Sequence, residues 1–380
     1  MTFTPEMARY LDESQEGLRE LIRQLCAIPA PSHHEEQRAA FCLRWFRDHG
    51  GDKAFIDEAN NVICPLGVTE EGPVTVFMAH TDTVFPDLEP LPLREEDDRI
   101  YCPAVCDDTA NLAILMLCAR YFLERKQAPA TGLVFVANAC EEGLGNLKGC
   151  RAVCARYGSR MERFVTLDGF TLNEIVDRAV GSHRYRVTVR TEGGHSFSAF
   201  GNRNAIHVLS TLITALYTVK VPQDGDSTTT YNVGLISGGT SVNTIAQEAS
   251  MLYEYRSDSQ VCMAQMERMF TAMVEAYRAT GVELTVEKIG DRPCAGAVDP
   301  ARQQALTDRA RAAIRFATGL EPYCCSGSTD GNMPLSLGIP SLCLATCKGK
   351  HWHTRGEYLE LDSLLPGSRL FLSFLADYLT

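Results

Sequence analysis

The sequence lacks any long apolar run and any basic leader. No stretch of 18 consecutive apolar residues occurs, and the first residues, MTFTPEMARYLDESQEG, have neither the basic start nor the apolar core of a signal peptide. Positive charge is also scarce, because 36 Lys and Arg residues stand against 48 Asp and Glu residues and leave a net charge of -12. We therefore expect a cytoplasmic protein that binds neither a membrane nor nucleic acid.

The cysteines support neither a zinc ribbon nor a disulfide framework. The fifteen cysteines include no CxxC pair, and several stand inside apolar segments such as LMLCARYF and SLCLATC. Cys150 and Cys154 lie four residues apart, a spacing that binds metal in some proteins. A chain of 380 residues does not need disulfides to be stable, so we favour reduced, buried thiols.

The chain is long enough for two domains, and the pattern of its apolar residues changes once. Helical patterns alternate with four apolar runs typical of buried strands: PVTVFMAH, TGLVFVANAC, RFVTLD and PSLCLA. This alternation predicts an α/β sheet covered by helices on both faces. Between residues 179 and 292, SHRYRVTVRTEGG and SMLYEYRSD alternate like half-exposed antiparallel strands, and the segments 202–218 and 259–279 have helical patterns. We predict one domain made of residues 1–178 and 293–380, with 179–292 inserted as a second domain.

Histidines and carboxylates collect where the predicted strands end. They stand in AHTDTV, ACEEG and TLDG, at the start of the apolar helix CDDTANLAILML, and in the C-terminal segment HWHTRGEYLEL. Open α/β sheets place their sites beyond the carboxyl ends of the strands, so we expect these side chains to converge.

Each of these polar residues also has a simple structural explanation. Either aspartate of CDDT, or its threonine, could cap the helix that follows. His80 alone could be a core histidine, and Glu141 with Glu142 could form a solvated turn. Together, two histidines and several carboxylates suit zinc, and carboxylate bridging suits two metals about 3.5–4 Å apart. The residues therefore predict a dinuclear metal hydrolase.

The same segments resemble, in order, the motifs of one family. They are AHTDTV, CDD, EEG, LDG, GGHS, GGTSVNT, STDGN with GIP, and HTRGE. The family is that of the co-catalytic zinc metallopeptidases, which include peptidase T, carboxypeptidase G, acetylornithine deacetylase and succinyl-diaminopimelate desuccinylase. The resemblance covers nearly the whole chain. It implies an α/β/α sandwich catalytic domain and an inserted α+β, ferredoxin-like lid and dimerisation domain at 179–292.

The resemblance also implies two divalent metal ions. Zinc is the first expectation, with cobalt or manganese as alternatives. Asp107 resembles the carboxylate that bridges the two metals. The other implied ligands are His80 and Asp168 on the first metal and Glu142 and His353 on the second.

Two further acids are implied in catalytic roles. Asp82 resembles the acid that orients the ligating His80. Glu141 resembles the general base that takes a proton from the attacking water and then passes it to the leaving amine. Because all these residues are present, a catalytic protein is favoured over a non-catalytic binding relative.

The sequence departs from the family pattern at one place and offers a choice at another. Thr109 and Ala110 stand where the family often has Lys and Gly. In HWH, the glutamate that the family keeps four residues after the ligand is Glu357, which selects His353. His351 is then expected to be a neighbouring polar or packing residue.

Three residues of the inserted domain match positions that act on substrate in the family. His195 in GGHS resembles the histidine that reaches the neighbouring subunit's site and stabilises the oxyanion, which implies a homodimer. Asn243 and Arg256 resemble residues that hold substrate, and an arginine fork suits a carboxylate. Alternatively, Arg256 could pair with Glu254 or Asp258 on its own strand.

The substrate class rests on small differences within the family. Asp168 stands where the deacylases and carboxypeptidase G have glutamate, and it resembles peptidase T and the dipeptidases. STDGNMPLSLGIP also resembles peptidase T. We therefore predict cleavage of short peptides, with hydrolysis of an N-acyl amino acid as the alternative.

Overall fold

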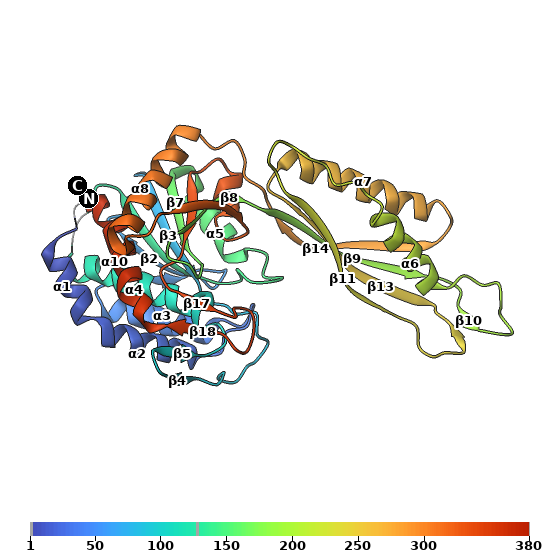
Figure 1. Ribbon diagram of the computed structural model, residues 1–380, viewed down its shortest axis with the longest axis horizontal. Helices are drawn as coiled ribbons and strands as arrows, with labels where there is room; N and C mark the ends of the chain where they lie inside the picture. Colours follow the sequence, from blue (N-terminus) through green and yellow to red (C-terminus); the bar gives the residue numbers. More distant parts are fainter. Residues whose placement is uncertain (1–2, 127–128, 380) are drawn as a thin grey trace. The chain divides into compact units, whose positions relative to one another are not determined.

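The computed structural model describes residues 3–126 and 129–379, and the chain divides into two units (Figure 1). Unit 1 comprises Met1–Ala179 and Gly296–Thr380, and unit 2 comprises Val180–Ala295. Unit 2 is therefore an insertion between two segments that fold together.

An eight-stranded sheet forms the centre of unit 1. Its strands lie in the order β1-β2-β6-β3-β7-β16-β8-β15. The middle strands β6, β3, β7 and β16 are parallel neighbours, whereas β2 and β8 pair antiparallel with β6 and β16. The bounds are β1 (Phe55–Ile56), β2 (Val62–Leu66), β3 (Val74–His80), β6 (Gly132–Asn138), β7 (Met161–Leu167), β8 (Glu174–Ala179), β15 (Tyr323–Gly327) and β16 (Ser341–Leu344). The four predicted buried strands correspond to β3, β6, β7 and β16.

Helices cover both faces of this sheet. The central strands carry apolar side chains on both faces, and each face needs a covering layer. Val76 and Met78 of β3 pack in one core with α5, whereas Phe77 and Ala79 pack in the larger core with α4 and α10. The helices of unit 1 are α1 (Pro5–Glu13), α2 (Gln15–Cys26), α3 (Glu36–Asp48), α4 (Asn111–Glu124), α5 (Lys148–Tyr157), α8 (Pro300–Thr318), α9 (Asn332–Ser336) and α10 (Leu364–Ala376). The predicted α/β sandwich is confirmed.

A small second sheet lies in the same unit. Its strand order is β17-β18-β5-β4, with bounds β4 (Arg94–Glu96), β5 (Arg99–Tyr101), β17 (Gly349–Lys350) and β18 (Tyr358–Glu360). The loop 351–357 connects β17 with β18. This loop contains His353, so the small sheet anchors both ends of a segment that the sequence assigns to the metal site.

Unit 2 has the ferredoxin-like βαββαβ arrangement that the sequence predicts. Its antiparallel sheet has the order β11-β13-β9-β14, and α6 and α7 pack on it. The bounds are β9 (Gly181–Arg190), α6 (Ala205–Leu216), β11 (Thr229–Gly238), β13 (Glu248–Ser257), α7 (Gln260–Arg278) and β14 (Glu283–Arg292). A short pair, β10 (Gly194–His195) with β12 (Thr244–Ile245), stands apart from this sheet.

The structure also bears on the expectations about cysteines and membrane-spanning helices. All fifteen cysteines are unpaired in the structure, and most are buried. Among the residues described, no helix combines the length and the apolar character that crossing a bilayer requires.

Two helical glycines provide a test of the packing of unit 1. A β-carbon on Gly367 of α10 would overlap the carbonyl oxygen of Thr346, whereas one on Gly17 of α2 would meet no atom within 4 Å. We predict that Gly367→Ala lowers the free energy of unfolding by about 1–3 kcal/mol through overpacking. Gly17→Ala should raise it by roughly 0.5–1 kcal/mol through helix propensity.

Urea unfolding followed by tryptophan fluorescence measures both effects, because Trp45 and Trp352 both belong to unit 1. Equal shifts of the two midpoints would contradict the close approach of α10 to the loop after β16.

Candidate metal centre

The candidate site forms where three adjacent parallel strands end. β3 lies between β6 and β7, and all three run in the same direction, so their carboxyl ends meet at one edge of the sheet (Figure 1). His80 is the last residue of β3, Asp168 directly follows β7, and the turn with Glu141 and Glu142 follows β6. The sheet topology therefore brings together residues that are far apart in the sequence.

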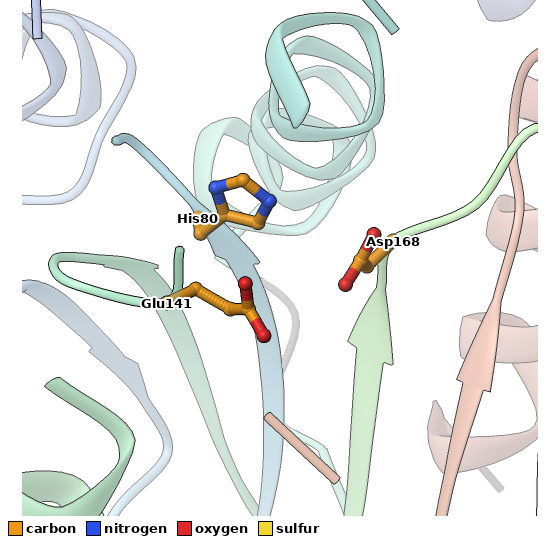
Figure 2. A group of neighbouring side chains, drawn as sticks. All are labelled: His80, Glu141 and Asp168. Atoms are coloured by element: carbon orange, nitrogen blue, oxygen red, sulfur yellow. The ribbon is translucent and has the colours of Figure 1, made fainter. Parts of the chain in front are cut away.

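Two overlapping groups of possible metal ligands occur at this edge. In each group the ligand atoms lie within 4.8 Å of one another. The first group is His80, Glu141 and Asp168, whose side chains point into one space (Figure 2). The second group is His80, Asp107 and Glu142, all of them buried.

Asp107 lies between the two histidines that the sequence assigns as ligands. Its Oδ1 is 3.1 Å from Nε2 of His80, and its Oδ2 is 2.9 Å from Nε2 of His353. Nε2 of His353 is also 3.2 Å from Oε1 of Glu142. Neither His353 nor His351 belongs to the two groups, but only His353 contacts their carboxylates; the centroid of the His351 ring lies 5.8 Å from that of Tyr358. The two carboxylate oxygens of Asp107 thus face different histidines, which is the arrangement that a bridging ligand requires.

An irregular helical turn, η1 (Val105–Ala110), carries Asp107. Neither aspartate caps α4, because this helix has no side-chain cap and begins only at Asn111. The carboxylate of Glu357 instead accepts the backbone N–H groups of Ala104 at 2.9 Å, Cys106 at 2.8 Å and Asp107 at 3.1 Å. The capping alternative is wrong, and Glu357 has a positioning contact that the motif alone did not show.

Asp82 holds both His80 and the glutamate turn. The backbone oxygen of Asp82 is 3.0 Å from Nδ1 of His80, and its carboxylate oxygen is 3.5 Å from the same nitrogen. The carboxylate also accepts the backbone N–H groups of Glu141 at 2.9 Å and Glu142 at 3.0 Å. Ser32, which the sequence did not single out, donates its hydroxyl to this carboxylate at 2.6 Å.

Crowded negative charge shifts the protonation of the site. Burial raises the pKa of Glu142 to about 7, and the charge of Asp107 adds to this effect. Burial, with the charges of Asp107 and Glu141, also raises the pKa of Asp168 well above its ordinary value. These carboxylates resist ionising together as long as no cation is near.

The same negative charge favours the charged form of the two histidines. Burial opposes the charged form of His80, but the carboxylates of Asp108, Asp107 and Asp82 outweigh it and raise the pKa of the ring. The pKa of His353 rises to about 10, because its ring contacts Asp107 and Glu142. The charged form of each ring would thus balance part of the negative charge of these carboxylates.

The donor set fits divalent cations. Imidazole nitrogen and carboxylate oxygen are ligands that zinc accepts, and carboxylates are also ligands for manganese. The buried Oε1 of Glu142 makes no hydrogen bond with suitable geometry, although it lies 3.2 Å from His353. A buried carboxylate oxygen without a hydrogen bond is available as a ligand of a cation.

Unit 2 brings two of its three predicted residues together. His195 pairs with Thr244 in the β10–β12 ladder, and the backbone oxygen of Asn243 accepts the N–H of Ser196 at 2.9 Å. Both side chains are exposed. Nδ1 of His195 accepts the backbone N–H groups of Phe197 at 3.2 Å and Ser198 at 3.4 Å. In the neutral ring the proton therefore lies on Nε2, which is a donor.

Arg256 lies away from these two residues, near the other end of β13. Eight residue steps separate it from Glu248, or about 25 Å at the rise of a strand. Its guanidinium binds both carboxylate oxygens of Glu254, at 2.9 and 3.1 Å. Arg184 contacts the same carboxylate at 3.3 Å. The pairing with Glu254 that the sequence left open as an alternative is present.

Comparison with known proteins agrees with the motifs and the site. YqjE of Bacillus subtilis, described as uncharacterized, is 26% identical, covering 96% of this chain and 99% of its own. A succinyl-diaminopimelate desuccinylase of Bordetella bronchiseptica is 24% identical, covering 79% and 81%. A tripeptidase structure from Staphylococcus aureus has a TM-score of 0.77 and 22% identity, covering 96% and 98%. The sequence also matches the model described as Peptidase family M20/M25/M40 over residues 76–377. Because this match spans more than half of the chain, the protein belongs to peptidase family M20/M25/M40.

Proposed function

We propose that this protein hydrolyses an amide bond of short peptides with the help of two divalent cations. The observation that supports this most is the position of Asp107, whose two oxygens face His80 and His353, beside a second group of possible ligands that shares His80. Hydrolysis of N-acyl amino acids is the alternative, since a desuccinylase is among the relatives at 24% identity.

Five residues would hold the two cations. His80 and Asp168 would bind the first, Glu142 and His353 the second, and Asp107 both. Zinc is the cation we favour, with cobalt or manganese as alternatives. When bound, such ions act as Lewis acids towards a carbonyl oxygen and lower the pKa of a water molecule.

Glu141 would transfer the proton. Its backbone N–H is fixed by Asp82 at 2.9 Å, and its carboxylate lies in the group with His80 and Asp168. From there it can accept a proton from water and deliver it to the leaving nitrogen. Its position among possible ligands also makes it a candidate ligand, which substitution can distinguish from a base.

We further propose that the active form is a homodimer joined through unit 2. β11 is an edge strand of its sheet, and Leu235 and Ile236 on it are both exposed. An apolar edge of this kind is suited to pair with a second copy across a two-fold axis. β13 spans about 25 Å between Glu248 and Arg256, and His195 pairs with Thr244, which precedes Glu248 in the chain, so one small substrate would contact His195 of one subunit and Arg256 of the other.

His195 would act as a hydrogen-bond donor to the oxyanion. Because its Nδ1 accepts two backbone N–H groups, Nε2 carries the proton in the neutral ring. Phe197 and Phe200 in this loop are highly exposed, which indicates a protein contact in the assembled state. Asn243 beside it would hold substrate, as would Arg256 once its pairing with Glu254 is shared with a substrate carboxylate.

The acidic composition and the unpaired cysteines suit a reducing, cytoplasmic environment, and we propose this location. The partners would be small peptides and a second copy of the chain, with no nucleic acid and no membrane.

The adjacent histidines test the metal assignment. We predict that wild-type protein loaded with zinc contains close to two ions per chain and that His353→Ala contains close to one. His351→Ala is the matched control and should retain two, because the His351 ring lies against Tyr358, whereas Nε2 of His353 lies 2.9 Å from Asp107 and 3.2 Å from Glu142. Elemental analysis after removal of loose metal measures this, and equal losses in both variants would contradict the assignment.

Glu141→Gln tests the reaction and the role of the base together. We predict that wild-type protein hydrolyses di- and tripeptides faster than N-acetyl or N-succinyl amino acids. Glu141→Gln should retain both metals and lose at least about 100-fold in kcat, as expected when a general base is removed.

Glu142→Gln is the control for this experiment and should lose metal together with activity. If Glu141→Gln loses metal as Glu142→Gln does, Glu141 is a ligand. If only the acyl amino acids are hydrolysed, the deacylase alternative is correct.

Mixed dimers test the use of His195 across the interface. Glu141→Gln chains and His195→Ala chains should each be inactive alone. In a mixed dimer, one site combines an intact Glu141 with an intact His195 of the partner subunit. Activity should therefore return, up to half of the wild-type value per mixed dimer. Differently tagged chains show whether the subunits exchange. Exchange without recovered activity would show that His195 does not serve the other subunit.

A further inference from the structure

An aromatic pair joins two loops that each carry a candidate metal ligand. Phe170 lies two residues after Asp168, and Trp352 directly precedes His353. Their rings stack with centroids 4.3 Å apart and planes inclined by only 7°. The two loops come from the two separate segments of unit 1, so this contact is made only in the folded site.

The two rings differ in exposure. Phe170 is partly buried and packs against the main core of unit 1. Trp352 is 47% exposed, although tryptophan is usually well buried. Phe170 thus packs between the core and one face of the Trp352 indole, and much of the indole remains exposed to solvent.

The backbone around Trp352 is unusual on both sides. His351 has φ of 63° and His353 has φ of 60°, a left-handed conformation that non-glycine residues seldom adopt. Between them, Trp352 stacks on Phe170, while the next side chain, His353, faces Asp107 and Glu142. This backbone shape places an open aromatic surface beside a histidine ligand.

Other exposed apolar side chains accompany the same site residues. Val84 lies two residues after Asp82 and is 37% exposed, and Leu144 lies two residues after Glu142 and is 53% exposed. The segments that carry polar residues of the site thus also carry apolar side chains that contact solvent. Exposed apolar groups near a polar cleft are typical of substrate-binding surfaces.

We propose that Trp352, supported by Phe170, forms an apolar wall of the substrate site and makes the enzyme select substrates with an apolar side chain beside the scissile amide. The inference rests on the proposed hydrolysis and specifies its substrate class. An apolar side chain that covers the indole removes surface of both groups from water, whereas a small polar side chain gains little.

The competing explanation is that the stack only fixes the loop of His353. In that case loss of the indole would disturb the metal site and slow the reaction for every substrate in the same proportion. A selectivity ratio separates the two explanations, because a displaced ligand changes the rate for all substrates whereas a lost wall changes the ratio.

The first experiment compares kcat/KM for leucyl-glycine and seryl-glycine, and for N-acetyl-leucine and N-acetyl-serine. We expect wild-type protein to prefer the leucine compound of the pair it hydrolyses. Trp352→Ala should reduce this preference roughly five- to tenfold with metal content unchanged, and Trp352→Phe should retain most of it.

Phe316→Ala is the matched control. Phe316 is 50% exposed, lies in α8 of the same unit and packs on another aromatic ring, that of Phe3. Its removal should leave the leucine preference as it is. An unchanged ratio in Trp352→Ala, or an equal loss for both members of a pair, would overturn the proposal.

The second experiment does not need turnover or the alanine variant. The chain has two tryptophans, so Trp45→Phe leaves Trp352 as the only one. In Trp45→Phe with Glu141→Gln, the fluorescence of Trp352 should respond to the leucine compounds at concentrations several times lower than to the serine compounds. Equal responses, or no response to compounds that calorimetry shows to bind, would also overturn the proposal.

The two proposals fail in different ways. If the protein hydrolyses neither class but the fluorescence still favours leucine compounds, the apolar wall stands and the proposed reaction is wrong. If hydrolysis is found without any leucine preference, the reaction stands and the wall is wrong.

Discussion

The buried carboxylate of Asp82 joins the segments on which the candidate site depends. It accepts the hydroxyl of Ser32 and the backbone N–H groups of Glu141 and Glu142, and it lies 3.5 Å from Nδ1 of His80. Burial alone would raise the pKa of Asp82, but the His80 ring and these hydrogen bonds lower it and keep the carboxylate ionised. The single carboxylate of Asp82 therefore helps to position both the ring of His80 and the turn that carries the two glutamates.

Two charged residues at the start of α3, Glu35 and Arg38, hold the backbone next to Asp82 and the glutamate turn. Glu35 accepts the backbone N–H of Cys140 at 3.1 Å, directly before the glutamate turn, where Cys140 has φ of 59°. The buried guanidinium of Arg38 donates to the carbonyl of Thr81 at 2.9 Å and to those of Leu25 and Ile28. The backbone directly before Asp82 and directly before Glu141 is thus held by charged side chains, because buried polar groups need such partners.

The sequence predicts the parts of this molecule that depend on local pattern. Continuous apolar runs predict β3, β6 and β7, and the polar residues directly after them indicate the edge where the site forms. The start of α4 was not predictable, since Asp107 is held outside the helix by Glu357, 250 residues later in the chain. The Trp352–Phe170 stack has the same origin: both residues look like ordinary apolar positions until folding joins their loops.

The position of Arg256 in the sheet of unit 2 bears on the proposed homodimer. Arg256 pairs in register with Ser182, which also pairs with Arg292, and these neighbours belong to the strands that enter and leave unit 2. In the sheet, Arg256 thus lies beside the residues where the chain enters and leaves unit 2, whereas His195 pairs with Thr244, before the Glu248 end of β13. If all three contact one short substrate, the span of about 25 Å between Arg256 and Glu248 favours the proposal that they come from two subunits. In the proposed homodimer, the insertion would separate substrate binding by the chain's own arginine from oxyanion stabilisation by its partner.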